Sequence, residues 1–269
     1  MFLPENIDLA QSEKYTLSIR LIPDGFSFCI YSTADRSVFH YQEKRFSKTL
    51  SQIGNIEKIF FEVNFFSHPF QKVEVTVVSP RYTTVPDAYF EKKRAGELFT
   101  FNIHGEHGKV LNNLVSETGY HILFDLDEEL YSFLCRNLWN PAFYSHQARL
   151  HPFLSNYRNE GNRKRCFVDF HDEMVSVTCF YGTRLLSSNT YPARERYEAL
   201  FNIANVWEHQ SLDQNTDLLV LSGNLRENSE STDTLRRLIR NVEELKPDTP
   251  NGYLSLPTDI LLALNSVES

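Results

Sequence analysis

The feature that most constrains the fold is a strand–turn–strand pattern that occurs twice in the chain. The first copy runs from Leu17 to Tyr31 around the turn Ile22-Pro23-Asp24-Gly25. The second runs from Cys166 to Phe180 around His171-Asp172-Glu173. In both copies apolar and polar residues alternate on each side of a short polar turn, which is typical of a β-hairpin.

The two hairpins align without a gap when Phe26 is set against Val175. After each hairpin come a third strand-like stretch, an amphipathic helical pattern and a short β-branched or leucine-rich strand. A β-β-β-α-β unit that occurs twice predicts an α/β protein with mixed sheets in two lobes. Asn159 to Arg165 is the most linker-like stretch, so we expect an N-terminal lobe at 1–158, with inserted strands and a helical hairpin, and a C-terminal lobe at 159–269.

Between these units the sequence predicts further elements with less regular patterns. Strands are expected at 14–21, 26–31, 37–46, 73–78, 98–103, 120–124, 166–170, 174–180, 183–191 and 217–221. Helices are expected at 48–66, from 84–87, from 125–128, at 144–157 with a kink or break at Pro152, after Pro192, around 235–242 and from Thr258. The helix after Pro192 is expected to bury one apolar face made of Tyr197, Leu200, Phe201, Ala204 and Trp207.

Charge and composition exclude several classes of protein. The formal net charge is −8, which argues against nucleic-acid binding because that binding depends on Lys and Arg contacts to phosphates. We interpret the short basic cluster Arg163-Lys164-Arg165 as a solvated linker. The chain has no long apolar run and no export signal, so we expect neither a membrane span nor secretion.

The four cysteines indicate a reducing compartment. Cys29, Cys135, Cys166 and Cys179 show no Cys-x-x-Cys spacing, and three of them fall in expected strands, where a free thiol packs as a small apolar group. A cytosolic location is therefore expected.

With these elements in place, the chain resembles the actin-like ATPase superfamily, which has a ribonuclease H-like fold and includes sugar kinases, heat-shock chaperones, actin and pilus-assembly proteins. In detail it is similar to an uncharacterised bacterial family with a degenerate form of that fold. The resemblance extends from about Lys14 to Lys246 and rests on the element order, the repeated hairpin and the sequence Leu218 to Gly223.

The resemblance implies where a nucleotide site would lie. In the superfamily each hairpin opens with an Asp that positions Mg²⁺ or the attacking group, followed by a glycine-rich turn whose backbone N–H groups hold phosphate. Here Arg20 stands in place of the first Asp, and Ile22-Pro23 replaces the first turn. The second hairpin keeps Asp169 but has His171-Asp172-Glu173 as its turn, and Gly223-Asn224 replaces the usual Gly-Gly pair beside the adenosine.

These departures remove the expected metal site and the anion cradle together. The favoured hypothesis is therefore a catalytically inactive protein without a cofactor, which acts as a cytosolic interaction or assembly module for a protein partner. The alternative is a divergent ATP- and Mg²⁺-dependent kinase or ATPase that uses the cleft between the lobes. In it, Asp169 would hold the metal, Gly223 and Asn224 would flank the nucleoside and Arg20 would contact a phosphate. A third reading places another small molecule in the same cleft.

Three other groups of residues admit a functional and a structural interpretation. His104-Gly105-Glu106-His107 would need a third ligand to bind zinc and is interpreted as a polar turn. The acids of 169–173 would suit a divalent cation, but a solvated hairpin tip is the favoured interpretation. Trp139, Phe143 and Tyr144 would suit a partner surface, but we favour packing between two helices.

Overall fold

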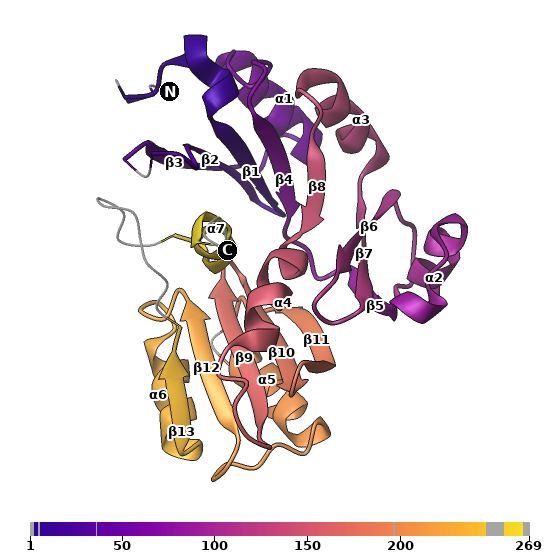
Figure 1. Ribbon diagram of the computed structural model, residues 1–269, viewed down its shortest axis with the longest axis vertical. Coiled ribbons are helices and arrows are strands. Elements are labelled where there is room, and N and C mark those ends of the chain that lie inside the picture. Colours follow the sequence, from indigo (N-terminus) through magenta and orange to yellow (C-terminus); the bar gives the residue numbers. More distant parts are fainter. Residues whose placement is uncertain (1–2, 5, 36, 196, 246–255, 266–269) are drawn as a thin grey trace. The chain divides into compact units, whose positions relative to one another are not determined.

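The computed structural model describes residues 3–4, 6–35, 37–195, 197–245 and 256–265 (Figure 1). By contacts between Cα atoms the chain divides into two compact units: unit 1 is Met1–Leu114 with His121–His146, and unit 2 is Val115–Tyr120 with Gln147–Ser269. The lobe limits of 1–158 and 159–269 stay a prediction from the sequence. Within the described residues no helix has the length and apolar character that crossing a lipid bilayer requires.

Unit 1 is built on a five-stranded sheet with the order β3-β2-β1-β4-β8. Its elements are β1 (Thr16–Ile22), β2 (Gly25–Tyr31), β3 (Phe39–Arg45), α1 (Gln52–Glu62), β4 (Lys72–Val77), α3 (Glu128–Asn137) and β8 (Ala142–Ser145), preceded by a short 3₁₀ helix, η1 (Leu9–Lys14). The hairpin strands are antiparallel, whereas β4 is parallel to β1 and to β8. The sheet is therefore mixed, as the sequence predicts.

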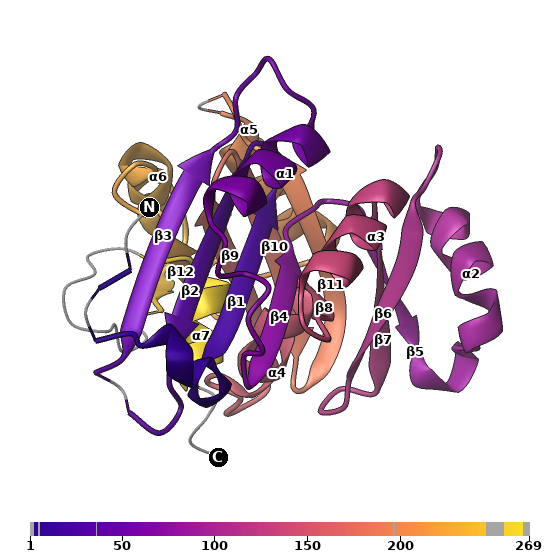
Figure 2. The ribbon, with the colours of Figure 1, turned by 90° about the horizontal axis from the view of Figure 1, so that it is seen from above.

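A smaller sheet with the order β5-β7-β6 is inserted between β4 and α3. It comprises β5 (Tyr82–Pro86), the 3₁₀ turns η2 (Asp87–Tyr89) and η3 (Lys92–Arg94), α2 (Ala95–Asn102), β6 (Lys109–Val115) and β7 (Tyr120–Leu126). Figure 2 shows α2 beside this sheet, where Phe99 packs against Val85 and Leu123.

The insert corrects two predictions and contains one strand that the sequence analysis missed. The expected helix start at 84–87 lies mostly in strand β5, the expected strand at 98–103 is helix α2, and β6 was not predicted. The alternation of apolar residues at 98–103 is misleading because Phe99 is buried while Phe101 is 82% exposed. A short apolar run does not distinguish a strand from a helix by periodicity alone.

Unit 2 repeats the architecture of unit 1, with the sheet order β11-β10-β9-β12-β13. Its elements are α4 (His146–Asn156), β9 (Lys164–His171), β10 (Met174–Tyr181), β11 (Arg184–Pro192), α5 (Glu198–His209), β12 (Leu218–Gly223), α6 (Ser229–Leu238), β13 (Asn241–Glu244) and α7 (Thr258–Asn265). Phe26 pairs with Leu21 in the first hairpin, and Val175 pairs with Phe170 in the second. The gapless alignment of the two hairpins is thus confirmed by their strand register.

Helices cover both faces of the second sheet. On one face Cys166, Val168 and Phe170 pack with residues of α5 and α6. On the other face Phe167 and Phe180 pack with Leu150 and Leu154 of α4 and with Leu262 of α7. Strand β9 is therefore buried along both faces, and its polar residues from Arg165 onward are buried together with its apolar ones.

Helix α5 buries a different face from the predicted one. Its buried residues are Ala199, Ile203, Val206 and Trp207, and Leu200 packs half-buried against the same core, so the prediction is correct for Trp207 and, in part, for Leu200. Tyr197 and Phe201 are 71% and 70% exposed. The helix carries apolar residues on two adjacent faces, and periodicity alone does not show which of them meets the sheet. The helix expected around 235–242 likewise ends at Leu238, and Val242 lies in β13.

The basic cluster Arg163-Lys164-Arg165, at the start of β9, is not a solvated linker, contrary to the prediction. Arg165 is 1% exposed, and its guanidinium donates to the carbonyl oxygens of Leu154 (3.3 Å), Ser155 (3.0 Å), Tyr157 and Gly182. Three of these carbonyls lie at the C-terminal end of α4, where backbone acceptors lack partners within the helix. Lys164 binds in the same manner near the end of α5, with Nζ 2.7 Å from the Gln210 oxygen.

Candidate functional site

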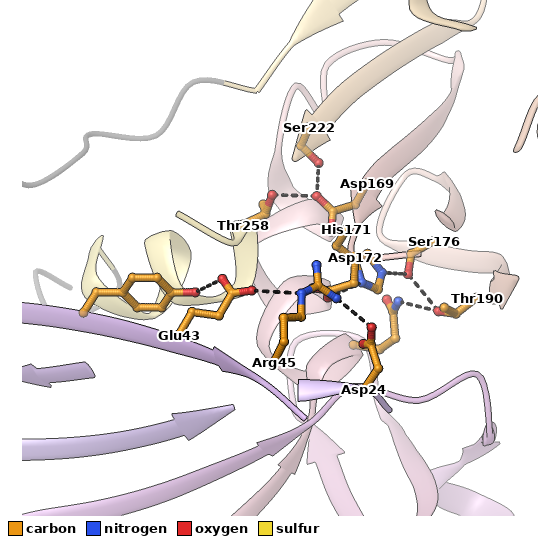
Figure 3. A network of polar contacts seen from close by, with 12 residues as sticks. Asp24, Glu43, Arg45, Asp169, His171, Asp172, Ser176, Thr190, Ser222 and Thr258 are labelled. Carbon is orange, nitrogen blue, oxygen red and sulfur yellow. Dashed lines mark hydrogen bonds and ion pairs between the residues drawn. The ribbon is translucent and has the colours of Figure 1, made fainter. Parts of the chain in front are cut away.

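A layer of polar side chains lies on the face of the second sheet that meets α4 and α7 (Figure 3). Side chains alternate along β9, so Asp169 and His171 share this face with Phe167, while Val168 and Phe170 point to α5 and α6. The candidate acid Asp169 therefore lies inside a covered face of the sheet and is only 7% exposed.

Two hydroxyl groups donate hydrogen bonds to the same carboxylate oxygen of Asp169. The Oδ1 atom accepts a hydrogen bond from Ser222 Oγ at 2.6 Å and from Thr258 Oγ1 at 2.5 Å. Ser222 is the register partner of Asp169 on the adjacent parallel strand β12, and Thr258 is the first residue of α7. Hydrogen bonds to a carboxylate are among the stronger ones, so this trio ties β9, β12 and α7 together.

His171, expected at a solvated hairpin tip, is buried and belongs to a second polar chain. Its Nε2 lies 2.8 Å from Ser176 Oγ, which lies 2.7 Å from Thr190 Oγ1, and Gln147 Nε2 donates to Thr190 at 3.3 Å. The Asp172 carboxylate lies 3.6 Å from His171 Nδ1. The expectation of a solvated turn is therefore wrong for His171, which is 5% exposed.

Gly223 and Asn224 form a turn that packs against the end of β9. Gly223 has a φ of +82°, and a Cβ atom there would lie 2.0 Å from the Phe170 carbonyl oxygen. The Asn224 N–H donates to that same oxygen at 2.7 Å. Both the glycine and the backbone N–H that follows it thus serve a contact within the protein.

Arg20 lies in unit 1, on β1, at the position that corresponds to Asp169 on β9. It is 3% exposed and faces Ser27 on β2 and Thr76 on β4 in the strand register. Burial raises the pKa of Tyr41 on β3, and the positive charge of Arg20 opposes part of that rise. The structure brings Asp169, Gly223 and Asn224 together at the ends of β9 and β12.

The turn of the first hairpin is closed by contacts within unit 1. Ile22 pairs with Gly25, so Pro23 and Asp24 are the two turn residues. Asp24 accepts from Arg45 Nη1 at 2.7 Å through its carboxylate, which Figure 3 draws, and its carbonyl oxygen accepts from the Phe46 N–H at 2.9 Å. Since Pro23 has no N–H to donate, this turn offers little to an anion.

Unit 1 has a cavity of about 510 Å³ at the C-terminal ends of β1 and β4. Arg81, which the sequence analysis did not single out, lies in its wall and binds Asp125 through Nε (3.1 Å) and Nη2 (2.9 Å). The Arg81 Nη2 atom also donates to the carbonyl oxygen of Glu106 at 2.8 Å. This arrangement fixes the 104–107 loop.

Neither histidine-containing group assembles a metal centre in the part of the chain that the structure describes. The search for three or more His, Cys, Asp or Glu side chains able to share an ion finds no such group there. In the 104–107 loop, His107 Nδ1 lies 2.8 Å from the Gly108 carbonyl oxygen. At the second hairpin, the Glu173 carboxylate lies 3.0 Å from Arg194 Nε.

The remaining groups singled out in the sequence are mainly structural. Cys29, Cys166 and Cys179 are buried thiols, whereas Cys135 on α3 is exposed. Of the aromatic group near Pro141, Phe143 packs against Tyr131 with ring centroids 5.0 Å apart. Trp139 is 63% exposed, so the expected packing between helices is wrong for its side chain.

A buried histidine next to the polar layer makes the stability of the protein depend on pH. His151 of α4 is fully buried, its Nδ1 lies 2.7 Å from Tyr120 Oη, and its Nε2 lies 3.0 Å from Ser188 Oγ. Burial lowers the pKa of His151 from 6.5 to about 3. Burial also raises the pKa of Tyr120 to about 12. Both groups are therefore neutral in the folded protein near pH 7.

Because His151 stays neutral when folded but binds a proton when unfolded below pH 6.5, its contribution to stability falls as the pH falls toward 3. Between pH 6.5 and pH 5 the loss is roughly 2 kcal/mol. Denaturant unfolding over this pH range should show a shallower slope for His151→Gln than for the unchanged protein. Equal slopes for the two proteins would contradict the assignment of a neutral buried imidazole.

Comparison with known proteins agrees with this architecture. The sequence profile of a family described as protein of unknown function (DUF3822) matches residues 4–242. No curated protein sequence matches the chain.

A crystal structure from Bacteroides thetaiotaomicron, of a protein with an actin-like ATPase fold and unknown function, is 28% identical. It has a TM-score of 0.84 and covers 96% of this chain and 98% of its own. The PilM–PilN type IV pilus biogenesis complex contains a chain with a TM-score of 0.54 and 14% identity, covering 94% of this chain and 99% of its own. The resemblance inferred from the hairpin repeat is thus confirmed: the chain belongs to the DUF3822 family and has the two-lobed α/β fold of the actin-like ATPases.

Proposed function

We propose that this protein is a catalytically inactive member of its fold class that acts as an interaction or assembly module for a protein partner. The observation that carries the proposal is the engagement of Asp169. One oxygen of its carboxylate, Oδ1, already accepts two hydroxyl hydrogen bonds, from Ser222 and Thr258. An acid held in this way serves as a structural link.

The phosphate-binding elements support the same proposal. A phosphate cradle needs free backbone N–H groups and glycines that allow close approach. The Asn224 N–H already donates to the carbonyl oxygen of Phe170, and Pro23 has no N–H. The second turn carries the carboxylates of Asp172 and Glu173. Carboxylates at that turn would repel a nucleotide phosphate.

The kind of partner follows from charge and from the fold class. A net charge of −8 disfavours nucleic acid and favours a protein partner. The PilM chain, similar in fold, is found in a complex with PilN. A cytosolic location fits the cysteine usage, because three of the four cysteines are buried thiols that form no disulfide. The alternative, a divergent ATPase, requires Asp169 to exchange both hydroxyl donors for a hydrated metal ion.

Asp169→Ala tests the structural role of this acid. The change leaves two buried hydroxyl groups without their acceptor, so the free energy of unfolding should fall by about 2–4 kcal/mol. Asp169→Asn keeps an acceptor oxygen, so its free energy of unfolding should fall by less. Denaturant unfolding of both variants gives the comparison, and a double-mutant cycle with Thr258→Val should show coupling.

The opposite result is equally informative. Carboxylates that are held for a ligand commonly reduce stability, so their removal leaves the folded protein as stable or more stable. An Asp169→Ala variant with unchanged or increased unfolding free energy would argue against the structural role and favour the ATPase alternative.

A further inference from the structure

The cavity of unit 1 has the size and the location of a ligand site. Its volume of about 510 Å³ lies in the range of sites for small molecules. All of the residues that line it belong to unit 1. It lies at the C-terminal ends of the parallel strands β1 and β4, next to the start of α3, and α/β proteins commonly bind ligands at this edge of a sheet.

The apolar part of the lining comes from the ends of β1, β4 and β7. Its buried members, each at most 6% exposed, are Leu21, Ile22, Val77, Val78 and Leu126. Buried apolar side chains that border a cavity suit an alkyl chain, because the chain leaves water when it contacts them.

The wall formed by the 106–108 loop is held in place. Gly108 packs on the end of β7, where an added Cβ atom would lie 2.2 Å from the Leu126 carbonyl oxygen. Arg81 binds this loop through the Glu106 carbonyl oxygen at 2.8 Å. A ligand that enters the cavity therefore meets a preformed wall, which lowers the entropy that binding costs.

Arg81 offers little to an anion. Its Nε and Nη2 atoms donate to the Asp125 carboxylate at 3.1 and 2.9 Å, and its Nη1 atom donates to the His104 carbonyl oxygen at 3.5 Å. The charge of the guanidinium is thus balanced by Asp125, which belongs to the same lining.

The polar groups that remain in the lining are mainly hydrogen-bond acceptors. His107 Nδ1 lies 2.8 Å from the Gly108 carbonyl oxygen, which can only accept, so Nδ1 carries the hydrogen and Nε2 is an acceptor in the neutral ring. The carboxylates of Glu106 and Glu128 also only accept, and within the described residues neither forms an ion pair. A lining rich in acceptors is complementary to a ligand rich in N–H donors.

Neighbouring charges do not cancel these two carboxylates. Asp127, the N-cap of α3, adds a further acid to the lining, and its Oδ1 atom accepts from the Leu130 N–H at 2.8 Å. Lys109 follows the 106–108 loop but does not line the cavity, and its Nζ atom lies 5.8 Å from the Tyr131 ring centroid. The described lining therefore keeps a net negative charge.

We infer that the cavity of unit 1 binds an organic cation that carries an ammonium or guanidinium group on an alkyl chain. Its N–H groups donate to the carboxylates of Glu106 and Glu128 and to His107 Nε2, and its chain lies on the apolar lining. Within the described residues no group of three or more His, Cys, Asp or Glu side chains could share a metal ion, so an organic cation fits the lining better than an inorganic one. The group comes from a free amine or from a Lys or Arg side chain of a partner.

The test is a titration of the full-length protein, with methyl groups of Val and Leu labelled for NMR. The probes are 1,4-diaminobutane, agmatine and a short alanine peptide with one central Arg, and 1,4-butanediol is the matched uncharged control. The methyl signals of Val78 and Leu126 should shift with a Kd of about 1 mM or tighter for a cationic probe, and should not shift with the diol. The tighter binder among the free amines and the peptide identifies the source of the cation.

Two variants locate the site. Glu106→Gln with Glu128→Gln should weaken binding by about tenfold or more, because charge-assisted hydrogen bonds are lost. Glu129→Gln is the matched control: it also removes an acid from the first turn of α3, but Glu129 does not line the cavity, so binding should be unchanged. All three residues are exposed, so thermal unfolding should be unaltered in both variants.

Three outcomes would overturn the inference. These are the absence of methyl shifts with every cationic probe, equal binding of the diol and the diamine, and a Glu106→Gln, Glu128→Gln variant that binds as tightly as the unchanged protein. None of these results bears on nucleotide or partner binding elsewhere, so failure of this site is distinguishable from failure of the proposed function.

Discussion

Arg165→Ala is expected to lower the free energy of unfolding by about 3–5 kcal/mol, the largest loss that we anticipate for a change of one side chain. The guanidinium is buried and donates to four carbonyl oxygens, three of them near the end of α4. The Cζ atom of the guanidinium also lies 5.8 Å from the ring centroids of Phe167 and Phe180. Removal leaves buried acceptors without a donor and opens a cavity between these rings.

Arg158→Ala is the matched control, because Arg158 lies near the same helix end and its side chain is 57% exposed. Its ion pair with Glu243 at 3.3 Å is exposed, so its loss should cost about 1 kcal/mol or less. The loss of stability in Arg165→Lys should lie between those of Arg165→Ala and Arg158→Ala, since an ammonium group cannot reproduce the hydrogen bonds of the planar guanidinium. Equal denaturant midpoints for Arg165→Ala and Arg158→Ala would contradict the structural role of Arg165.

Gly223→Ala should lower the free energy of unfolding by about 3 kcal/mol or more. The residue has a φ of +82°, and the added Cβ would lie 2.0 Å from the Phe170 carbonyl oxygen and 2.8 Å from its carbon. Relief of this overlap requires the backbone of β9 or β12 to move. The contact lies beside the Ser222–Asp169 hydrogen bond, so the polar layer should be disturbed as well.

Gly161→Ala separates conformational strain from steric overlap. Gly161 has a φ of +81°, and an added Cβ there meets nothing within 4 Å. Its substitution should cost about 1 kcal/mol from backbone conformation alone. Thermal unfolding of the two variants measures the difference, and similar losses at both positions would contradict a packing role for Gly223.

The hairpin repeat could be predicted from the sequence because its signals are local. Two-residue alternation around a polar turn specifies a hairpin, and the structure confirms the predicted strands at 26–31 and 174–180. The helix predicted from Thr258 is also confirmed, as α7. The insert was harder to predict, because α2 has no capping side-chain hydrogen bond at its N-terminus and its apolar residues alternate.

The contacts that define the candidate site could not be predicted in the same way. The donors to Asp169 come from Ser222 and Thr258, 53 and 89 residues further along the chain. Arg165 lies in the polar segment Arg163-Lys164-Arg165 where β9 begins, which is typical of solvated residues, and its burial depends on the last turn of α4. Such pairings are set by tertiary packing, which one sequence without its fold does not reveal.

Nucleotide binding tests the central claim most directly. Thermal unfolding of the full-length protein should be recorded with and without millimolar Mg²⁺-ATP and Mg²⁺-ADP. A ligand that binds only the folded state at a concentration about a hundredfold above Kd adds about 2.7 kcal/mol and raises the midpoint. We predict no shift with either nucleotide. A clear upward shift that Asp169→Ala abolishes would contradict the account and establish Asp169 as part of a working nucleotide site.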